Sequence, residues 1–262
     1  MFCKFYLRSA FASAETINRL DFNFSTSALE GFPLVCTNGA KGVQVRKCTN
    51  EEAKDAEDEV KSNPMTDGRL MVTQIFHNPV SLDLTKKTLA LAKAIGCVTN
   101  YYVDHDVYAH PAEELHHELT SRYSTLTGVT YTYRQDEYEE ALARDLPSKL
   151  LILCEESEID STFEKVSAHL GEDAMVIRGS PPFFVEVLDK NVCKGKGLEK
   201  MCANLKVDMK ECISFGDGDN DIEFLQMCGL GFAMKNARDN VKKIADGITE
   251  HTNMEVSHFL AQ

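Results

Sequence analysis

Residues 212–221, CISFGDGDND, constrain the fold of this chain more than any other stretch. A short apolar run ends abruptly at Gly216, and Asp217, Asp219 and Asp221 follow it within five residues. The next residues, IEFLQMC, are typical of a helix, so the pattern predicts a strand, a tight turn and a helix. The three carboxylates then lie at the carboxyl end of a strand, where open α/β sheets bind ligands.

Two interpretations of this acidic turn remain open on the stretch alone. Carboxylates this close repel one another unless a cation or hydrogen-bond donors compensate them, and hard oxygen ligands suit Mg²⁺. The other interpretation is a solvated turn in which Asn220 or Asp221 is an ordinary N-cap. A calcium loop is excluded, because it needs Gly at its sixth position and Glu at its twelfth, where this chain has Ile222 and Cys228.

The composition excludes some partners. The 262 residues include 41 acidic and 28 basic side chains, a net charge of −13, which argues against nucleic acid and anionic membranes. Small anionic substrates stay possible, because a local basic pocket or a bound metal can hold them. Nine cysteines without a C-x-x-C pair indicate a reduced, cytoplasmic protein, or an organellar one if a targeting peptide precedes this sequence. The sequence has no apolar run of 18 residues, so no membrane span is predicted. The oligomeric state is not predicted.

The middle of the chain alternates strand-like and helix-like segments. It predicts strands at 69–76, 97–103, 129–133, 148–154, 174–178 and 183–188, and helices at 51–60, 84–96, 112–126, 137–146 and 158–170. This pattern indicates a compact α+β module. A strand at 33–40 precedes it, and the helices and strand at 195–205, 231–234, 236–246 and 253–260 give the tail a doubly wound α/β character.

Four segments occur in the order typical of one family. They are PLVCTNGA (33–40), KGKGLEKMCANL (194–205), GDGDND (216–221) and GFAMKNA (231–237). Together they resemble the haloacid dehalogenase superfamily, in its Cof-like subclass near the sucrose-phosphate phosphatases. The resemblance covers essentially the whole chain.

The resemblance implies a Rossmann-like α/β core, residues 1–42 and 182–262, with an inserted α+β cap, residues 43–181, that sets substrate choice. It implies a Mg²⁺-dependent phosphatase acting on small phosphorylated metabolites such as sugar phosphates. Two alternatives remain open. One is a non-catalytic protein that binds a phosphorylated ligand, and the other is a phosphosugar mutase on the same fold.

The resemblance also assigns roles to residues. Lys194 would be the catalytic and substrate-binding lysine, which neutralises the phosphoryl oxygens and the attacking carboxylate. Its place at a helix start, beside Gly195, also favours anions. Asp217 would be a metal ligand. Asn220 and Asp221 would complete the metal site, as ligands, as holders of a ligand or as a substrate contact. Asp219 occupies a variable position and is expected to be solvated.

The family's nucleophile motif is missing from this sequence. The motif is D-x-D-G-T at the end of the first strand, and nothing of that form precedes Asn38. The one Asp before Asn38 is Asp21, with no second Asp two residues later. We therefore expect a core without its first strand, and a truncated chain that is inactive. An in-frame D-x-D-G-T upstream in the genomic sequence would support this.

The N-terminal residues resemble the family's second motif instead. In FYLRSA (5–10), Arg8-Ser9 matches the Arg-Ser of that motif, while Tyr6 and Leu7 replace its Thr and Gly. The phosphate-binding hydroxyl of the motif is therefore absent. This match also argues against an alternative interpretation of the basic N-terminus as a transit peptide.

Three further candidates belong to the segment YYVDHDVYAH (101–110), which the resemblance would turn toward the active site: Tyr101, His105 and His110. The plainer interpretation, a β-hairpin with a polar tip, is preferred for most of them. His116 and His117 are adjacent on a predicted helix and point apart, so they do not form a metal pair. Cys193 precedes Lys194, but without a supporting His and Asn it is predicted to be a packed thiol.

Overall fold

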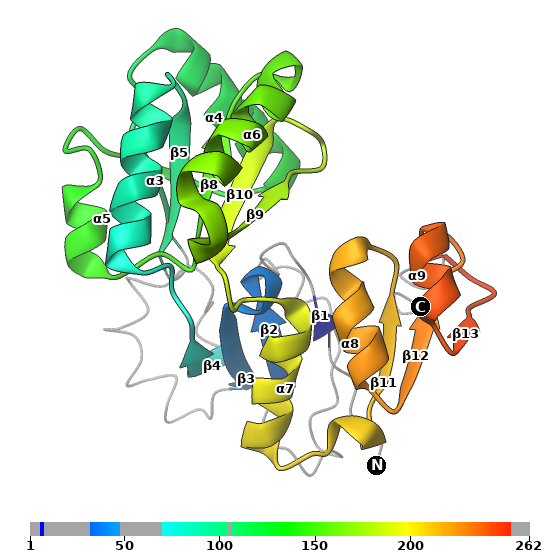
Figure 1. Cartoon of the computed structure of the whole chain (residues 1–262). Helices are drawn as coiled ribbons and strands as arrows, with labels where there is room; N and C mark the ends of the chain where they lie inside the picture. The colour runs from blue at the N-terminus through cyan, green and yellow to red at the C-terminus, as the bar shows by residue number, and fades with distance from the viewer. Residues whose placement is uncertain (1–5, 8–31, 48–69, 104–105, 253–262) are drawn as a thin grey trace. The chain divides into compact units, whose positions relative to one another are not determined.

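The computed structural model describes residues 6–7, 32–47, 70–103 and 106–252. The chain divides into two compact units, which are described separately. The first unit combines residues 1–76 with residues 193–262, and the second unit is residues 77–192 (Figure 1). No helix in the described part of the chain is long and apolar enough to cross a membrane.

The described residues of the first unit form two sheets. One sheet has the order β1-β2-β3-β4, with β1 (Tyr6–Leu7) parallel to β2 (Phe32–Cys36), which is antiparallel to β3 (Lys41–Lys47). Its last strand is β4 (Leu70–His77). The other sheet is parallel, and its strands are β11 (Ile213–Gly216), β12 (Leu230–Ala233) and β13 (Gly247–Ile248).

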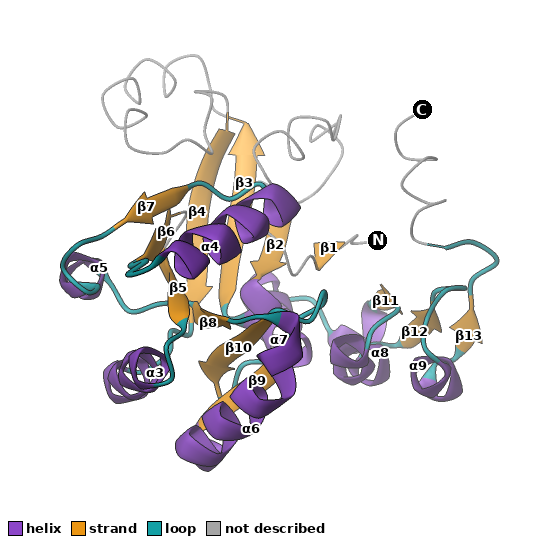
Figure 2. Ribbon diagram, turned by 90° about the horizontal axis from the view of Figure 1, so that it is seen from above, coloured by secondary structure: helices purple, strands orange, loops and turns teal. Residues whose placement is uncertain are grey.

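Among the described residues, three helices pack against these strands. They are α7 (Lys194–Leu205), α8 (Ile222–Met227) and α9 (Asp239–Ile244). Helices α8 and α9 lie on one side of the β11–β12–β13 sheet (Figure 2). The buried side chains of Leu198, Phe224 and Val241, one from each helix, belong to one apolar cluster. Burial of this cluster fixes the helices relative to the strand that carries the acidic turn.

The second unit is a six-stranded sheet in the order β7-β6-β5-β8-β10-β9 with helices packed on it. Its strands are β5 (Val98–Val103), β6 (Asp106–Ala109), β7 (Tyr131–Tyr133), β8 (Lys149–Leu153), β9 (Ala174–Arg178) and β10 (Phe184–Asp189). Its helices are α3 (Leu82–Ala94), α4 (Glu114–Thr127), α5 (Glu139–Arg144) and α6 (Ile159–Leu170). The buried core includes Tyr101, Leu150, Ile152, Val166 and Val187.

Local signals explain where several of these elements begin and end. The Ser81 side chain accepts a hydrogen bond from the Leu84 N–H and so caps the start of α3. Gly96 follows the end of α3 with a φ of +72°, and Gly128 caps α4 with a φ of +74°. Both glycines occupy the left-handed region, which glycine adopts at little cost.

The observed α/β class agrees with the sequence, and most predicted elements are present. Strands β3 and β13 were not predicted, and α9 is shorter than the predicted 236–246 helix. The predicted helices at 51–60 and 253–260 lie outside the described residues. In the described part of the chain the single parallel sheet expected of the core is represented by two sheets, with β1 and β11 at their edges.

The division into units also differs from the predicted core of 1–42 and 182–262 and cap of 43–181. The structural boundaries fall at 76/77 and 192/193. The physical reason is strand pairing. Strands β3 and β4 extend the sheet that contains β2, so they belong to the first unit. Strand β10 pairs with β8 and β9, so it belongs to the second unit.

Candidate active site

The acidic turn is closed by one of its own carboxylates. Strand β11 ends at Gly216, and η7 (Asp219–Asp221) leads directly into α8. The Asp221 Oδ2 atom accepts hydrogen bonds from the backbone N–H groups of Asp217 at 2.9 Å and Gly218 at 3.0 Å. A Cβ atom on Gly216 would lie 2.5 Å from the Asp221 Cβ atom, so the turn needs glycine there. Asp221 is consequently buried, with 5% of its surface exposed.

Lys194 contacts this buried carboxylate. Its Nζ atom lies 2.5 Å from the Asp221 Oδ1 atom, and both side chains are buried. Lys194 is the first residue of α7, whose first turn packs closely against α8. A Cβ atom on Gly195 would lie 2.8 Å from the Met227 Sδ atom. The two sequence segments that carry Lys194 and Asp221 therefore meet in the fold.

The N-G-A segment meets the same helix start. A Cβ atom on Gly39 would lie 2.1 Å from the Cys193 carbonyl oxygen, and one on Gly197 would lie 2.6 Å from the Gly39 Cα atom. Asn38 and Gly39 both have positive φ values, so the chain bends sharply at these residues, next to the start of α7. Three of the four segments that resemble the family thus converge within the first unit.

The fourth segment and the residues that follow it, up to Asn240, also contact the acidic turn. The Asn236 side-chain amide donates to Asp217 Oδ2 at 3.4 Å, and the Arg238 backbone N–H donates to the Asp217 carbonyl at 3.3 Å. Asn240 Nδ2 donates to Asp219 Oδ1 at 2.7 Å, and the Arg238 guanidinium pairs with Asp219 Oδ2. The Asn240 hydrogen bond, aided by Arg238, lowers the pKa of the Asp219 carboxyl group. Asp219 is exposed, as expected, but it is bound to two side chains.

The Cys193 thiol is unsuited to nucleophilic attack. Its Sγ atom caps α7 by accepting a hydrogen bond from the Lys196 N–H at 3.4 Å. Burial raises the pKa of this thiol above its ordinary value, so the neutral form prevails at neutral pH. The geometry agrees with the packed thiol predicted from the sequence.

No group of three or more His, Cys, Asp or Glu side chains among the described residues is arranged to hold a metal ion. Asp217 presents a half-exposed carboxylate, and Asn220 is exposed with its Oδ1 atom above Gly218. Both Asp221 oxygens already accept hydrogen bonds from nitrogen donors. Among the three roles left open for Asp221, the geometry favours that of a holder.

The candidate residues of the second unit make structural contacts. The Tyr101 side chain is fully buried, and its hydroxyl donates to the Asp145 carbonyl at 2.8 Å. His110 Nδ1 lies 2.7 Å from the Arg134 carbonyl oxygen. These contacts agree with the hairpin interpretation, and His105 lies outside the described residues.

The adjacent histidines of α4 have different surroundings. His116 is buried, with Nε2 3.0 Å from the Gly96 carbonyl oxygen. The His117 ring instead packs edge-on against Tyr133, with 5.5 Å between ring centroids. The two rings therefore do not form a metal pair.

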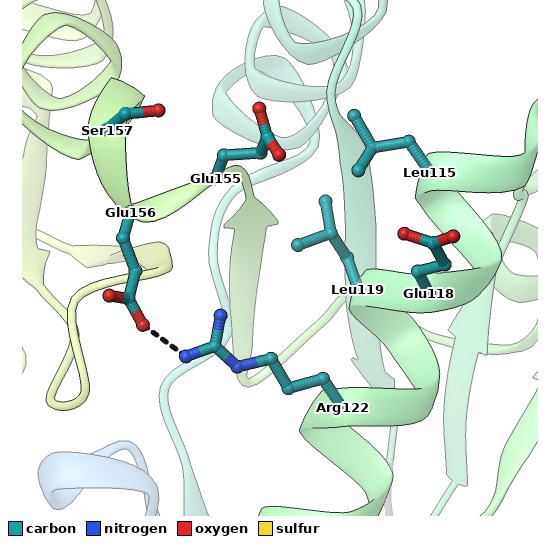
Figure 3. A pocket seen from close by; sticks show the side chains of 7 residues that line it. All are labelled: Leu115, Glu118, Leu119, Arg122, Glu155, Glu156 and Ser157. Carbon is teal, nitrogen blue, oxygen red and sulfur yellow. Dashed lines mark hydrogen bonds and ion pairs between the residues drawn. The ribbon is translucent and has the colours of Figure 1, made fainter.

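Sequence reasoning missed one pocket, an open hollow of about 410 Å³ beside α4 in the second unit (Figure 3). Its lining residues are Leu115, Glu118, Leu119, Arg122, Glu155, Glu156 and Ser157. Arg122 points across the hollow to pair with Glu156, and its guanidinium lies 4.2 Å from the centre of the Phe183 ring. The four helical residues recur at i, i+3, i+4 and i+7, a spacing that indicates one helix face.

Comparisons with known proteins give the family. The model of the haloacid dehalogenase-like hydrolase family matches residues 71–260. A phosphoglycolate phosphatase of Methanopyrus kandleri is 40% identical over 98 residues, 37% of this chain and 42% of that protein. A 5-amino-6-(5-phospho-D-ribitylamino)uracil phosphatase of Bacillus subtilis is 31% identical over 192 residues, 71% of this chain and 68% of that protein. The chain thus spans less than half of the first relative's length.

A solved structure shares the fold. The crystal structure of a Thermotoga maritima protein matches with a TM-score of 0.65 at 23% identity, over 87% of this chain and 74% of that chain. The family model covers more than half of this chain, and the B. subtilis relative is matched over two thirds of both lengths. The superfamily predicted from the four segments is confirmed: the chain belongs to the haloacid dehalogenase-like hydrolases.

Proposed function

We propose that this chain carries the lysine and the acidic turn of a Mg²⁺-dependent phosphatase for small phosphorylated metabolites such as sugar phosphates. The observation that carries the proposal is the buried contact between Lys194 Nζ and Asp221 Oδ1, at the start of α7 and beside the carboxyl end of β11. A buried cation at a helix start, next to an acidic turn, suits a phosphate that is bound together with a metal ion.

Each residue has a separate task in this proposal. Lys194 has three N–H donors, of which one serves Asp221, so it can also donate to a phosphate oxygen. Asp221 keeps the ammonium in place and closes the turn with its other oxygen. Asn220, which is exposed on the same turn, contacts the substrate or completes the metal site.

The donor set fits Mg²⁺. This ion is commonly bound by one or two carboxylates together with waters and substrate phosphate, so a preformed group of three protein ligands is not required. Asp217 would hold it, with Asn220 as the second candidate ligand. When bound, the ion neutralises charge that develops on the phosphoryl oxygens.

Substrate size is inferred from the relatives and from the fold. The two relatives described above are phosphatases of phosphoglycolate and of a phosphorylated ribitylaminouracil, both of them small phosphate monoesters. We propose the second unit, residues 77–192, as the substrate-selecting cap. A panel of metabolite phosphates would identify the substrate.

The decisive experiment measures phosphate release from p-nitrophenyl phosphate with Mg²⁺. The 262-residue chain has no D-x-D-G-T motif, so we expect no turnover. The same chain with a D-x-D-G-T strand segment added at its N-terminus should release phosphate, and Lys194→Met in that longer chain should abolish release. Turnover by the 262-residue chain without this segment would contradict the assignment of the nucleophile to the missing motif.

The same assay separates the two alternatives. A non-catalytic ligand-binding protein would bind phosphorylated metabolites, but it would not release phosphate even with the added segment. A phosphosugar mutase would convert one phosphosugar into an isomer without releasing inorganic phosphate.

A further inference from the structure

Asp219 lies at the centre of a small clamp between the acidic turn and the start of α9. One carboxylate oxygen accepts from Asn240 Nδ2 at 2.7 Å, and the other pairs with the Arg238 guanidinium. The Arg238 backbone N–H also donates to the Asp217 carbonyl at 3.3 Å. The contacts join residues that are 19 and 21 positions apart, so they tie two separate segments together.

The clamp reduces the electrostatic repulsion among the three neighbouring carboxylates of the turn. Asp221 is paired with Lys194, and Asp219 is paired with Arg238. The two partners come from different elements, since Lys194 is the first residue of α7 and Arg238 directly precedes the first residue of α9. The backbone of Asp217 is held by hydrogen bonds from both segments, because its N–H donates to Asp221 Oδ2 and its carbonyl accepts from the Arg238 N–H.

We propose that Asp219, together with Arg238 and Asn240, is a positioning residue that holds the backbone of Asp217 so that the Asp217 carboxylate is set for Mg²⁺. This inference rests on the proposed function, because it takes Asp217 as the metal ligand. Asp219 itself is directed to Arg238 and Asn240 and is not a ligand. It acts through the shape of the turn.

A direct electrostatic role makes the opposite prediction, so the two roles can be separated. If Asp219 merely attracts the cation through space, removing the positive charge of Arg238 tightens metal binding. If Asp219 positions the turn, the same removal weakens binding because the clamp is broken. Asn240→Ala removes a hydrogen bond without changing any charge, so it weakens binding under the positioning role alone.

The experiment measures the Kd of Mn²⁺ by electron paramagnetic resonance for the full chain and its variants. Positioning predicts a Kd about two- to fivefold weaker for Arg238→Ala and for Asn240→Ala, the range expected for exposed charged contacts. Arg238→Lys keeps the charge and a donor, and should restore most of the affinity. Lys243→Ala is the matched control, because it removes an exposed positive charge from the same helix.

Each outcome decides the question. Unchanged or tighter binding in Arg238→Ala and Asn240→Ala would overturn the positioning role while leaving the metal site intact. If the unaltered chain binds no Mn²⁺ at millimolar concentration, the inference is also overturned, because there is no ion to position. The phosphatase proposal is judged separately, by phosphate release from the chain with the added D-x-D-G-T segment.

Discussion

Lys194 and Asp221 place a positive and a negative charge where little water reaches either. Removing such groups from water costs several kcal/mol each, which only close pairing and further hydrogen bonds offset. The 2.5 Å contact and the two backbone N–H groups on Asp221 Oδ2 provide both. The arrangement keeps an ammonium fixed at a helix start, and this is the property that phosphate binding needs.

Breaking this pair should destabilise the protein strongly. Lys194→Met leaves the Asp221 carboxylate buried without its cation, and we expect a loss of about 3 kcal/mol in the free energy of unfolding. Urea unfolding followed by circular dichroism measures it. Lys196→Met, on the same helical turn but exposed, should change the free energy by less than about 0.5 kcal/mol. Equal effects of the two substitutions would show that the buried pair has no special role.

Cys36 gives the protein a predictable response to alkaline pH. Burial raises the pKa of this thiol to about 11, against an ordinary value of 9.0, although nearby Lys41 opposes the shift. The neutral thiol therefore contributes stability that is present below pH 9 and is lost as the pH rises toward 11.

The comparison of wild type with Cys36→Ala tests this response. Two pKa units correspond to about 2.7 kcal/mol, so the stability advantage of the wild type should shrink by about 2 kcal/mol between pH 9 and pH 11. Urea unfolding at a series of pH values measures the difference. An advantage that stays constant over this range would contradict a raised pKa at Cys36.

At the scale of the elements, the start of α7 is fastened between the N-G-A turn and α8. Gly197 permits the closest approach, since a Cβ atom there would lie 2.6 Å from the Gly39 Cα atom and 2.7 Å from Val35 Cγ1. In an open helix, replacing glycine by alanine stabilises by about 1 kcal/mol. At this position the backbone clash should reverse that sign.

Gly197→Ala should therefore lower the free energy of unfolding by about 2 kcal/mol, because overpacking against backbone forces α7 away from the turn. Thermal and urea unfolding measure the change. Lys196→Ala, the neighbouring exposed position, is the matched control and should lie within about 0.5 kcal/mol of the wild type. A stabilised Gly197→Ala protein would mean that α7 does not need this close contact.

Elements with strong local signals could be predicted from the sequence, and contacts between distant segments could not. The apolar run ending at Gly216 gives β11, and Gly96 marks the end of α3. The segment KGVQVRK forms β3, which has only a short alternating pattern and contains residue 43, the expected start of the cap. Helix α9 begins late because Arg238 is extended and pairs with Asp219.

The site shows the same limit. Lys194, Asp217, Asn220 and Asp221 could be proposed as site residues from short segments that resemble a family, because each segment is contiguous in the sequence. The contact between Lys194 and Asp221 could not be predicted, because these residues are separated by 27 positions and only the packing of α7 against α8 brings them together. Asp219 was expected to be solvated, but its side chain contacts Arg238 and Asn240. These two residues follow β12 in the sequence, so a short segment around Asp219 does not reveal them.

At the scale of the whole molecule, the two units differ in how the chain builds them. The first unit combines two segments separated by the entire second unit, while the second unit is one continuous segment, 77–192. The second unit also has its own buried core around Tyr101, Leu150 and Val187. A continuous segment with its own core is expected to fold alone.

A fragment of residues 77–192 should therefore unfold cooperatively, with a free energy of unfolding of about 5–10 kcal/mol.

The matched control is a fragment with the boundaries expected from the sequence, residues 43–181. It lacks β10, which lies between β8 and β9, so β9 loses its partner and β8 loses one neighbour. Unpaired buried backbone groups cost about 1–3 kcal/mol each, so this fragment should not reach a cooperative fold. Circular dichroism during urea unfolding, together with amide dispersion in proton–nitrogen NMR spectra, distinguishes the two. If residues 43–181 folded as well as residues 77–192, β10 would be dispensable for the second unit and the boundary at 192/193 would have to be moved.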